Sequence, residues 1–217
     1  MLDFAAAREA MVDCQVRPAD VTRYSIIEAM LWAPRERFVP KSRRAIAYAE
    51  AEVEVAPGRA LLEPRVFAKM LEAAAVTPKD LVLDLAPATG YSTAVLARLA
   101  EAVVAVEPDG ALARKAQQAM ADLEVDNAVV ASGDPTEGDA AHGPYDVIFL
   151  GGAVERIPET LFDQLGQDGR LIAILRQGAA GRCALYTRTA SGISDRTVFD
   201  ATAPLIAGFE APPAFEF

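Results

Sequence analysis

The sequence predicts an α/β protein with a mostly parallel sheet and helices on both of its faces. From residue 64 onward, short apolar runs alternate with amphipathic segments of helical period, which is typical of βαβ units. Near the C-terminus, the strand-like segments 183–189 and 193–200 flank Ala190-Ser191-Gly192, which favours a turn. We therefore expect an antiparallel hairpin to extend the parallel sheet at its end.

Residues 1–56 are expected to form a helical N-terminal layer. Between residues 21 and 31, apolar side chains recur at helical spacing; Thr22 is the expected N-cap and Pro34 ends the helix. The stretch Ala56-Pro57-Gly58 predicts a turn. The chain is accordingly divided into this layer, residues 1–56, and an α/β domain, residues 57–217.

The α/β domain is expected to begin with a helix, because Pro64 suits a first helical turn and one apolar stripe follows it to residue 74. After it, strands and helices alternate. Strands are expected at 81–86, 102–107, 128–132, 145–152 and 170–175, and helices at 91–100, 109–124 and 159–165.

Charge and composition limit the partners of the chain. A net charge of −10 disfavours binding to nucleic acid and to anionic membranes. The N-terminus does not read as a signal peptide, and no run approaches the ~18 apolar residues of a membrane span. Cys14 and Cys183 are far apart in the sequence and lack metal-ligand spacing. We expect a cytoplasmic protein without a metal site, with no nucleic-acid or membrane partner; an oligomer is left open.

The end of the first predicted strand has the features of a nucleotide-type site. Asp84 leads into a loop of small residues, Ala86-Pro87-Ala88-Thr89-Gly90, and then into a helix, which places a pocket at the carboxyl edge of the sheet. The next strand ends in Glu107, where an acid can accept hydrogen bonds from both ribose hydroxyls of an adenosine cofactor. Asp134, after the third strand, is placed to reach adenine or ribose. The alternative is an ordinary turn with Glu107 exposed.

The loop itself favours S-adenosylmethionine over a dinucleotide. Ala86 and Ala88 stand where glycines are usual, and only Gly90 remains. Alanine disfavours positive φ and adds a methyl group at the ligand face. A pyrophosphate needs bare backbone N–H groups at the helix N-terminus, whereas S-adenosylmethionine carries no phosphate.

Several segments in order resemble the protein-L-isoaspartate O-methyltransferase family. They cover nearly the whole chain: MVDCQVRPADV (11–21), EAMLWAPRERFVP (28–40), AYAEAEVEV (47–55), LVLDLAPATGYSTAVLA (81–97), VVAVEP (103–108), SGDPTEG (132–138) and YDVIFLGGAVERIPETLFDQLGQDGRLIAIL (145–175). The resemblance implies a Rossmann-like methyltransferase fold. It implies methyl transfer from S-adenosylmethionine to the carboxylate of an isoaspartyl residue in a damaged protein or peptide, which begins repair. Carried over by position, the implied cofactor residues are Asp84, Ala86, Ala88, Gly90, Glu107, Asp134, Leu150 and Gly151.

The acceptor motif departs from the family. Where the family has Gln-Thr-Ile-Ser-x-Pro, this chain has Arg59-Ala60-Leu61-Leu62-Glu63-Pro64. Leu62 stands at the position of the family's hydroxyl and cannot donate a hydrogen bond to the acceptor carboxylate.

Three interpretations of this departure remain open. In the first, the family activity is kept and Arg59 or Arg65 supplies the lost contact, since an arginine can bind a carboxylate in bidentate fashion. In the second, the chain methylates a different, more apolar acceptor. In the third, catalysis is impaired and the chain acts as a cofactor-binding or protein-interaction module.

Overall fold

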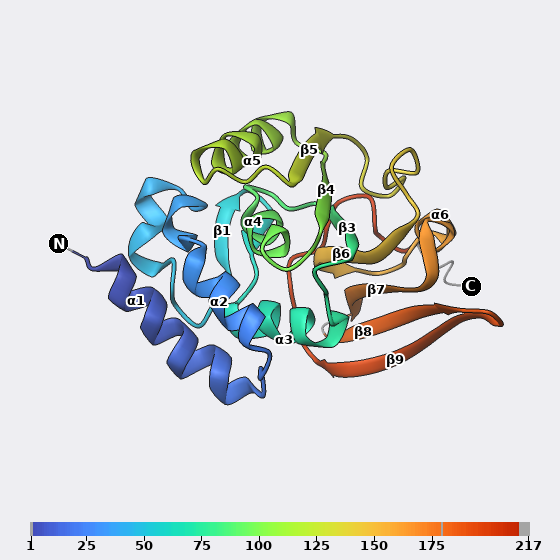
Figure 1. Ribbon diagram of the computed structural model, residues 1–217, viewed down its shortest axis with the longest axis horizontal. Coiled ribbons are helices and arrows are strands. Elements are labelled where there is room, and N and C mark those ends of the chain that lie inside the picture. Colours follow the sequence, from blue (N-terminus) through green and yellow to red (C-terminus); the bar gives the residue numbers. More distant parts are fainter. Residues whose placement is uncertain (1, 179, 213–217) are drawn as a thin grey trace.

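A seven-stranded sheet runs through the centre of the protein, with strand order β5-β4-β3-β6-β7-β8-β9 (Figure 1). The computed structural model describes residues 2–178 and 180–212. Five strands are parallel: β3 (Leu81–Leu85), β4 (Ala102–Glu107), β5 (Ala128–Ser132), β6 (Tyr145–Val154) and β7 (Leu165–Gln177). The antiparallel hairpin β8 (Ala180–Thr189) and β9 (Gly192–Asp200) extends the sheet beyond β7. The predicted fold class and the C-terminal hairpin are confirmed.

The register of the parallel strands brings the predicted site to one edge of the sheet. Leu85 at the end of β3 lies beside Val106, so Glu107 at the end of β4 lies next to the loop that leaves β3. The strands are apolar runs because both faces of the sheet are covered. The site is thus set by which strands are neighbours, β3 and β4, and by where each of them ends.

Two buried clusters of apolar side chains lie on the two faces of the sheet. The larger contains side chains of α3 (Pro64–Ala74), α4 (Tyr91–Ala97) and α5 (Gly110–Asp122) together with the N-terminal layer. The smaller is covered by α6 (Glu159–Asp163) and by the chain around Ile206 and Phe209. Helices therefore cover both faces, as predicted, although the second face has one short helix and an extended segment.

The N-terminal layer is helical over most of its length but ends in a hairpin. Its helices are α1 (Phe4–Met11) and α2 (Tyr24–Trp32), with shorter π or 3₁₀ turns at Val12–Val16, Arg17–Ala19, Arg35–Arg37 and Lys41–Ile46. Strands β1 (Val53–Ala56) and β2 (Arg59–Leu61) then pair antiparallel around the predicted turn at Pro57-Gly58. The position chosen as the boundary between layer and domain, 56/57, falls within this hairpin.

Thr22 does not cap α2, contrary to the prediction. The helix begins at Tyr24 after Arg23, and no side chain caps it. The Thr22 hydroxyl instead donates to Glu72 Oε1 of α3 at 3.4 Å, and the Arg23 N–H donates to Glu72 Oε2 at 3.2 Å. A carboxylate from another helix is a stronger acceptor for this chain segment than a threonine hydroxyl, so the tertiary contact replaces the local cap.

The buried Arg35 ties the N-terminal layer to the α/β domain. Its guanidinium donates to the Ala47 carbonyl at 2.7 Å and to the Leu62 carbonyl at 2.6 Å, and it lies 4.9 Å from the centre of the Tyr91 ring. Burial lowers the pKa of Arg35 from its usual value. Because these contacts reach three separate segments, Arg35 fixes the position of the chain just before α3.

In the described part of the chain, the helices are too short or too polar to traverse a lipid bilayer.

Gly90 is the one residue of the loop after β3 that close packing requires to be glycine. Its φ is +91°, and a Cβ there would lie 2.9 Å from Ala116 Cβ of α5. We expect Gly90→Ala to lower the free energy of unfolding by about 2–4 kcal/mol, from left-handed strain together with overpacking, measured by urea denaturation. Gly178→Ala is the control: its φ is +64°, and a Cβ would meet no described atom within 4 Å. An equal loss in both variants would contradict the packing argument.

Candidate functional site

The loop after β3 keeps a left-handed backbone although alanine has replaced glycine. Ala86 has φ +57° and Ala88 has φ +55°. The Ala86 N–H donates to the Val106 carbonyl at 2.9 Å, and the Ala88 N–H donates to Glu107 Oε2 at 2.7 Å. Each left-handed alanine costs roughly 1–2 kcal/mol, which these hydrogen bonds help to offset. The loop therefore retains the backbone shape that the lost glycines would have allowed.

Glu107 is fully buried, and its carboxylate accepts four hydrogen bonds. Besides the Ala88 N–H, the Asp109 N–H donates to Oε1 at 3.1 Å. The other two donors are Nη1 and Nη2 of Arg59, each 2.7 Å from its own carboxylate oxygen. A carboxylate offers about four acceptor positions, so all of them are used.

Arg59 lies where the sequence places the ribose of an adenosine cofactor. Its side chain reaches from β2 to the edge of the sheet and is 15% exposed. Nη2 also donates to the Ala86 carbonyl at 3.0 Å. The guanidinium thus binds both the acid at the end of β4 and the loop at the end of β3. The sequence offers Arg59 as a ligand of the acceptor carboxylate; in this structure its guanidinium is bound to the buried Glu107 instead.

The space left in front of the loop is small and apolar. A cavity of about 20 Å³ lies between Ala86, Leu62, Phe67, Tyr91 and Gly151, which is room for about one water molecule. A second cavity, of about 10 Å³, borders Arg59, Ala86 and Gly151, so an adenosine cofactor does not fit beside the Arg59 side chain in this conformation. The backbone frame and Glu107 fit the cofactor; the conformation of Arg59 does not.

Asp84 is a second buried carboxylate at the same end of the sheet. Its Oδ2 accepts hydrogen bonds from Ser92 Oγ at 2.8 Å and Thr93 Oγ1 at 2.7 Å. Among the described residues, Oδ1 has no hydrogen-bond partner. Burial raises the pKa of Asp84 to about 7, the two hydroxyls oppose that rise, and the nearby Glu107 charge adds to it. An unpartnered buried carboxylate oxygen here suits a cationic ligand group.

The other predicted cofactor residues are not all brought together. Gly151 borders the small cavity, and a Cβ there would lie 3.8 Å from the Ala86 carbonyl oxygen. Leu150 is fully buried in the smaller apolar cluster, which also contains Ala86. Asp134 is exposed and accepts hydrogen bonds from the N–H and hydroxyl of Thr136, at 2.8 and 2.7 Å. Asp84, Ala86, Ala88, Gly90, Glu107 and Gly151 form the compact part of the site.

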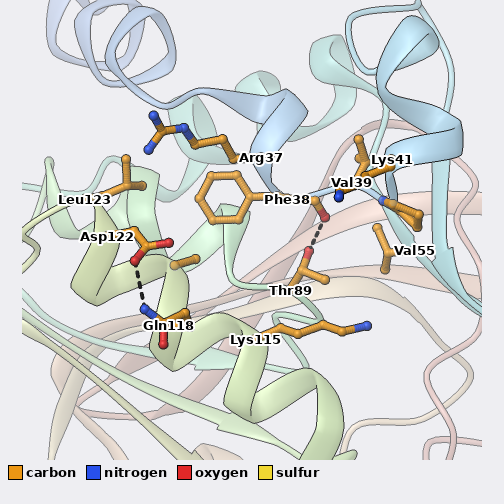
Figure 2. Close-up of a pocket in the computed structure, with 12 residues that line it drawn as sticks. Arg37, Phe38, Val39, Lys41, Val55, Thr89, Lys115, Gln118, Asp122 and Leu123 are labelled. Carbon is orange, nitrogen blue, oxygen red and sulfur yellow. Dashed lines mark hydrogen bonds between the residues drawn. The ribbon is translucent and has the colours of Figure 1, made fainter.

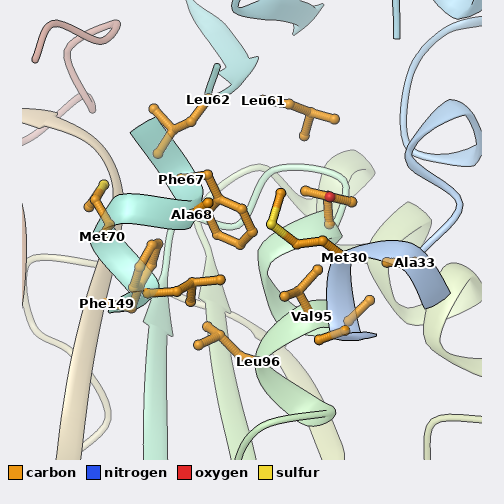
Figure 3. Close-up of a cluster of buried hydrophobic side chains, with 14 of the residues drawn as sticks. Met30, Ala33, Leu61, Leu62, Phe67, Ala68, Met70, Val95, Leu96 and Phe149 are labelled. Atoms are coloured by element: carbon orange, nitrogen blue, oxygen red, sulfur yellow. The ribbon is translucent and has the colours of Figure 1, made fainter. Parts of the chain in front are cut away.

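Leu62 belongs to the hydrophobic core next to this site. Figure 3 shows it above Phe67 and close to the cluster that includes Met70 and Phe149. Its side chain is 5% exposed, and its carbonyl is held by Arg35. Arg65, the other candidate for the acceptor, instead forms an exposed ion pair with Glu63 at 2.9 Å. The position at which the family resemblance implies an acceptor contact is therefore lined by apolar side chains in this conformation.

A larger cavity lies on the other side of Thr89. It measures about 360 Å³ and lies between the N-terminal layer and α5, with Phe38, Val39 and Leu123 among its apolar lining (Figure 2). The Thr89 hydroxyl donates to the Phe38 carbonyl at 2.6 Å and so ties the loop after β3 to the layer. This cavity is separate from Glu107, which does not line it.

The comparisons with known proteins agree on one family. The family model for protein-L-isoaspartate(D-aspartate) O-methyltransferase matches residues 6–201. A protein-L-isoaspartate O-methyltransferase of Gloeobacter violaceus is 37% identical over 190 residues, which cover 87% of this chain and 93% of the relative. The protein of the same name from Koribacter versatilis is 36% identical over 198 residues, 91% of this chain and 88% of the relative.

Solved structures show the same fold. A protein-L-isoaspartate O-methyltransferase aligns with a TM-score of 0.83 and 24% identity, over 93% of this chain and 66% of that one. A beta-aspartate methyltransferase from Plasmodium falciparum, in complex with S-adenosyl-L-homocysteine, aligns with a TM-score of 0.78 and 18% identity, over 94% of this chain and 97% of that one. Sequence, sheet order and the geometry of the β3–β4 edge lead to one conclusion: the chain belongs to the protein-L-isoaspartate O-methyltransferase family.

Proposed function

We propose that this chain transfers a methyl group from S-adenosylmethionine to the carboxylate of isoaspartyl residues in proteins or peptides. The family to which it belongs is one of S-adenosylmethionine-dependent carboxyl methyltransferases. The observation that carries the proposal is the buried carboxylate of Glu107 at the end of β4, facing a left-handed loop at the end of β3. This pair of features matches an adenosine site at the edge of a parallel sheet.

Within this proposal, each part of the compact site has a role. Glu107 accepts the ribose hydroxyls, and the left-handed backbone of Ala86 and Ala88 allows a ligand to approach closely beside Gly151. Asp84 Oδ1, which has no partner among the described residues, accepts from the amino group at the other end of the cofactor. When bound, the cofactor supplies a methyl group on a positively charged sulfur. Asp134, which follows β5, and Leu150, which lies within β6, remain proposed contacts of the cofactor.

The reaction asks little proton transfer of the protein. An isoaspartyl carboxylate, with a pKa near 4, is ionised at pH 7 and needs no general base. Orientation of the two reactants and exclusion of water supply most of the rate, roughly 7–11 kcal/mol in favourable cases. The apolar wall formed by Leu62, Phe67 and Phe149 is suited to excluding water.

Methyl transfer to matched peptides tests the proposed function. With radiolabelled methyl donor, we expect a base-labile methyl ester on a peptide that contains isoaspartate. The same peptide with normal aspartate is the control and should remain unlabelled. Arg59→Gln, which removes the guanidinium bound to Glu107, is assayed beside the wild-type chain. The proposal is overturned if neither protein labels either peptide. Labelling of a different acceptor only would favour the changed-acceptor interpretation.

Substitution of Leu62 tests whether this residue faces the acceptor. In Leu62→Ser, a hydroxyl next to the acceptor carboxylate should raise kcat/KM for the isoaspartyl peptide about tenfold or more over Leu62→Ala, since hydrogen bonds to charged groups contribute roughly 1.5–3 kcal/mol. Leu62→Ala is the matched control, because it opens the same space without a donor. Both variants should lose about 2–4 kcal/mol of stability by chemical denaturation. Equal kcat/KM values would place Leu62 away from the acceptor.

The proton on Asp84 makes the stability of the protein depend on pH. Its folded-state pKa is raised from 3.8 to about 7, so between these pH values the folded chain binds more protons than the unfolded chain. Stability therefore falls as pH rises through this range and levels off above about pH 7. A bound cation beside Oδ1 would favour the ionised form and release the proton.

Removal of this carboxylate should flatten that dependence. Asparagine does not titrate. The free energy of unfolding of Asp84→Asn minus that of wild type should therefore be about 2–3 kcal/mol larger at pH 8 than at pH 5. Urea denaturation at both pH values measures it. The exposed Asp122→Asn is the control and should follow wild type. Parallel pH curves for wild type and Asp84→Asn would show that Asp84 is ionised throughout.

A further inference from the structure

The acceptor positions of Glu107 leave no place for a ribose while Arg59 is bound. Two of its four hydrogen bonds come from the backbone N–H groups of Ala88 and Asp109, which belong to the fixed frame of the site. The other two come from one side chain, that of Arg59. A ribose diol also donates two hydrogen bonds. The guanidinium and the diol therefore require the same two positions on the same carboxylate.

The Arg59 side chain is also the part of the site that can move. It belongs to β2, a three-residue strand that pairs only with β1, and two-stranded hairpins are marginally stable on their own. Its guanidinium is partly exposed, whereas Glu107 is fully buried. Rotation of the side chain alone would free both carboxylate oxygens and the Ala86 carbonyl, without any change in the sheet.

Arg59 stabilises the buried Glu107 carboxylate more than a ribose diol does. Arg59 brings a full positive charge to a buried carboxylate, and such bidentate pairs are among the stronger hydrogen-bonded contacts. A ribose diol is neutral and leaves the charge of Glu107 without a counter-ion. Removing one partner of a buried ion pair is costly, because the other charge stays buried without a counter-ion. The conformation that can bind the cofactor is thus a minor one, and the apparent affinity falls in proportion to its population.

We infer that Arg59 competes with the ribose of the cofactor for Glu107, so that the cofactor binds only after the guanidinium has left. This inference rests on the proposed function and identifies the residue that limits cofactor affinity. It assigns Arg59 to the cofactor side of the site.

Calorimetric titration with S-adenosylhomocysteine tests the inference without any need for turnover. We expect Arg59→Gln to bind this probe at least tenfold more tightly than wild type. Arg65→Gln is the matched control, because Arg65 lies six residues away in an exposed ion pair, and it should bind as wild type does. The 2′-deoxy analogue of the probe should show a smaller gain in Arg59→Gln, since it offers one hydroxyl fewer to Glu107.

Arg59→Lys is a second variant that allows the same test if Arg59→Gln does not fold. It keeps a positive charge near Glu107 but cannot make the bidentate contact, and its affinity for the probe should lie between those of wild type and Arg59→Gln. Circular dichroism melts identify which variants are folded.

The possible results separate the inference from the proposed function. If wild type and the folded Arg59 variants bind the probe equally tightly, Arg59 does not compete, and the inference falls while the function stands. If neither wild type nor any folded Arg59 variant binds at millimolar probe, both fall. Tighter binding by the variants supports the inference, whatever their methyl-transfer activity.

Discussion

The buried charge of Glu107 is the constraint on which the rest of the site depends. A carboxylate with no solvent access must be neutralised or fully hydrogen-bonded. Here the loop after β3 supplies one backbone N–H, the start of α5 another, and Arg59 the remaining two donors. The left-handed loop places the Ala88 N–H against Glu107, while the Ala86 N–H donates to the neighbouring Val106 carbonyl. The same demand explains why a side chain of β2 reaches the edge of the sheet.

The N-terminal layer and the β1–β2 hairpin at its end are therefore part of the site. Arg35 holds the carbonyl of Leu62, Thr89 binds the carbonyl of Phe38, and Arg59 binds Glu107. Each contact joins a polar group of the layer or of the hairpin to a polar group of the chain from Leu62 onward, and each is buried or nearly so. Three such links in the neighbourhood of one loop make the position of the layer and the shape of the cofactor site interdependent.

Most of the sheet and its helices could be predicted from the sequence, because burial on both faces leaves continuous apolar strands between amphipathic helices. The β1–β2 hairpin could not, since its two strands are three and four residues long and show too little periodicity. Thr22 failed as a cap because Glu72, fifty residues away, accepts hydrogen bonds from the Thr22 hydroxyl and the Arg23 N–H and so holds this segment ahead of the helix. The positions of Glu107 and the loop followed from strand spacing. The pairing of Arg59 with Glu107 did not, because a contact across 48 residues leaves no local pattern, although an arginine in place of the family's glutamine was its visible sign.

Leu62 gives the hairpin a fixed end. Its carbonyl accepts a hydrogen bond from the buried guanidinium of Arg35, whereas Gly58 in the turn is exposed. The hairpin is therefore held at Leu62 and exposed at its turn. Arg59 lies between the two, one residue from Gly58 and three from Leu62, so any displacement of the turn relative to Leu62 would carry the Arg59 backbone with it. Ala60 belongs to the same strand and borders the small apolar cavity. The same displacement would therefore enlarge that cavity and free the ribose position on Glu107 together.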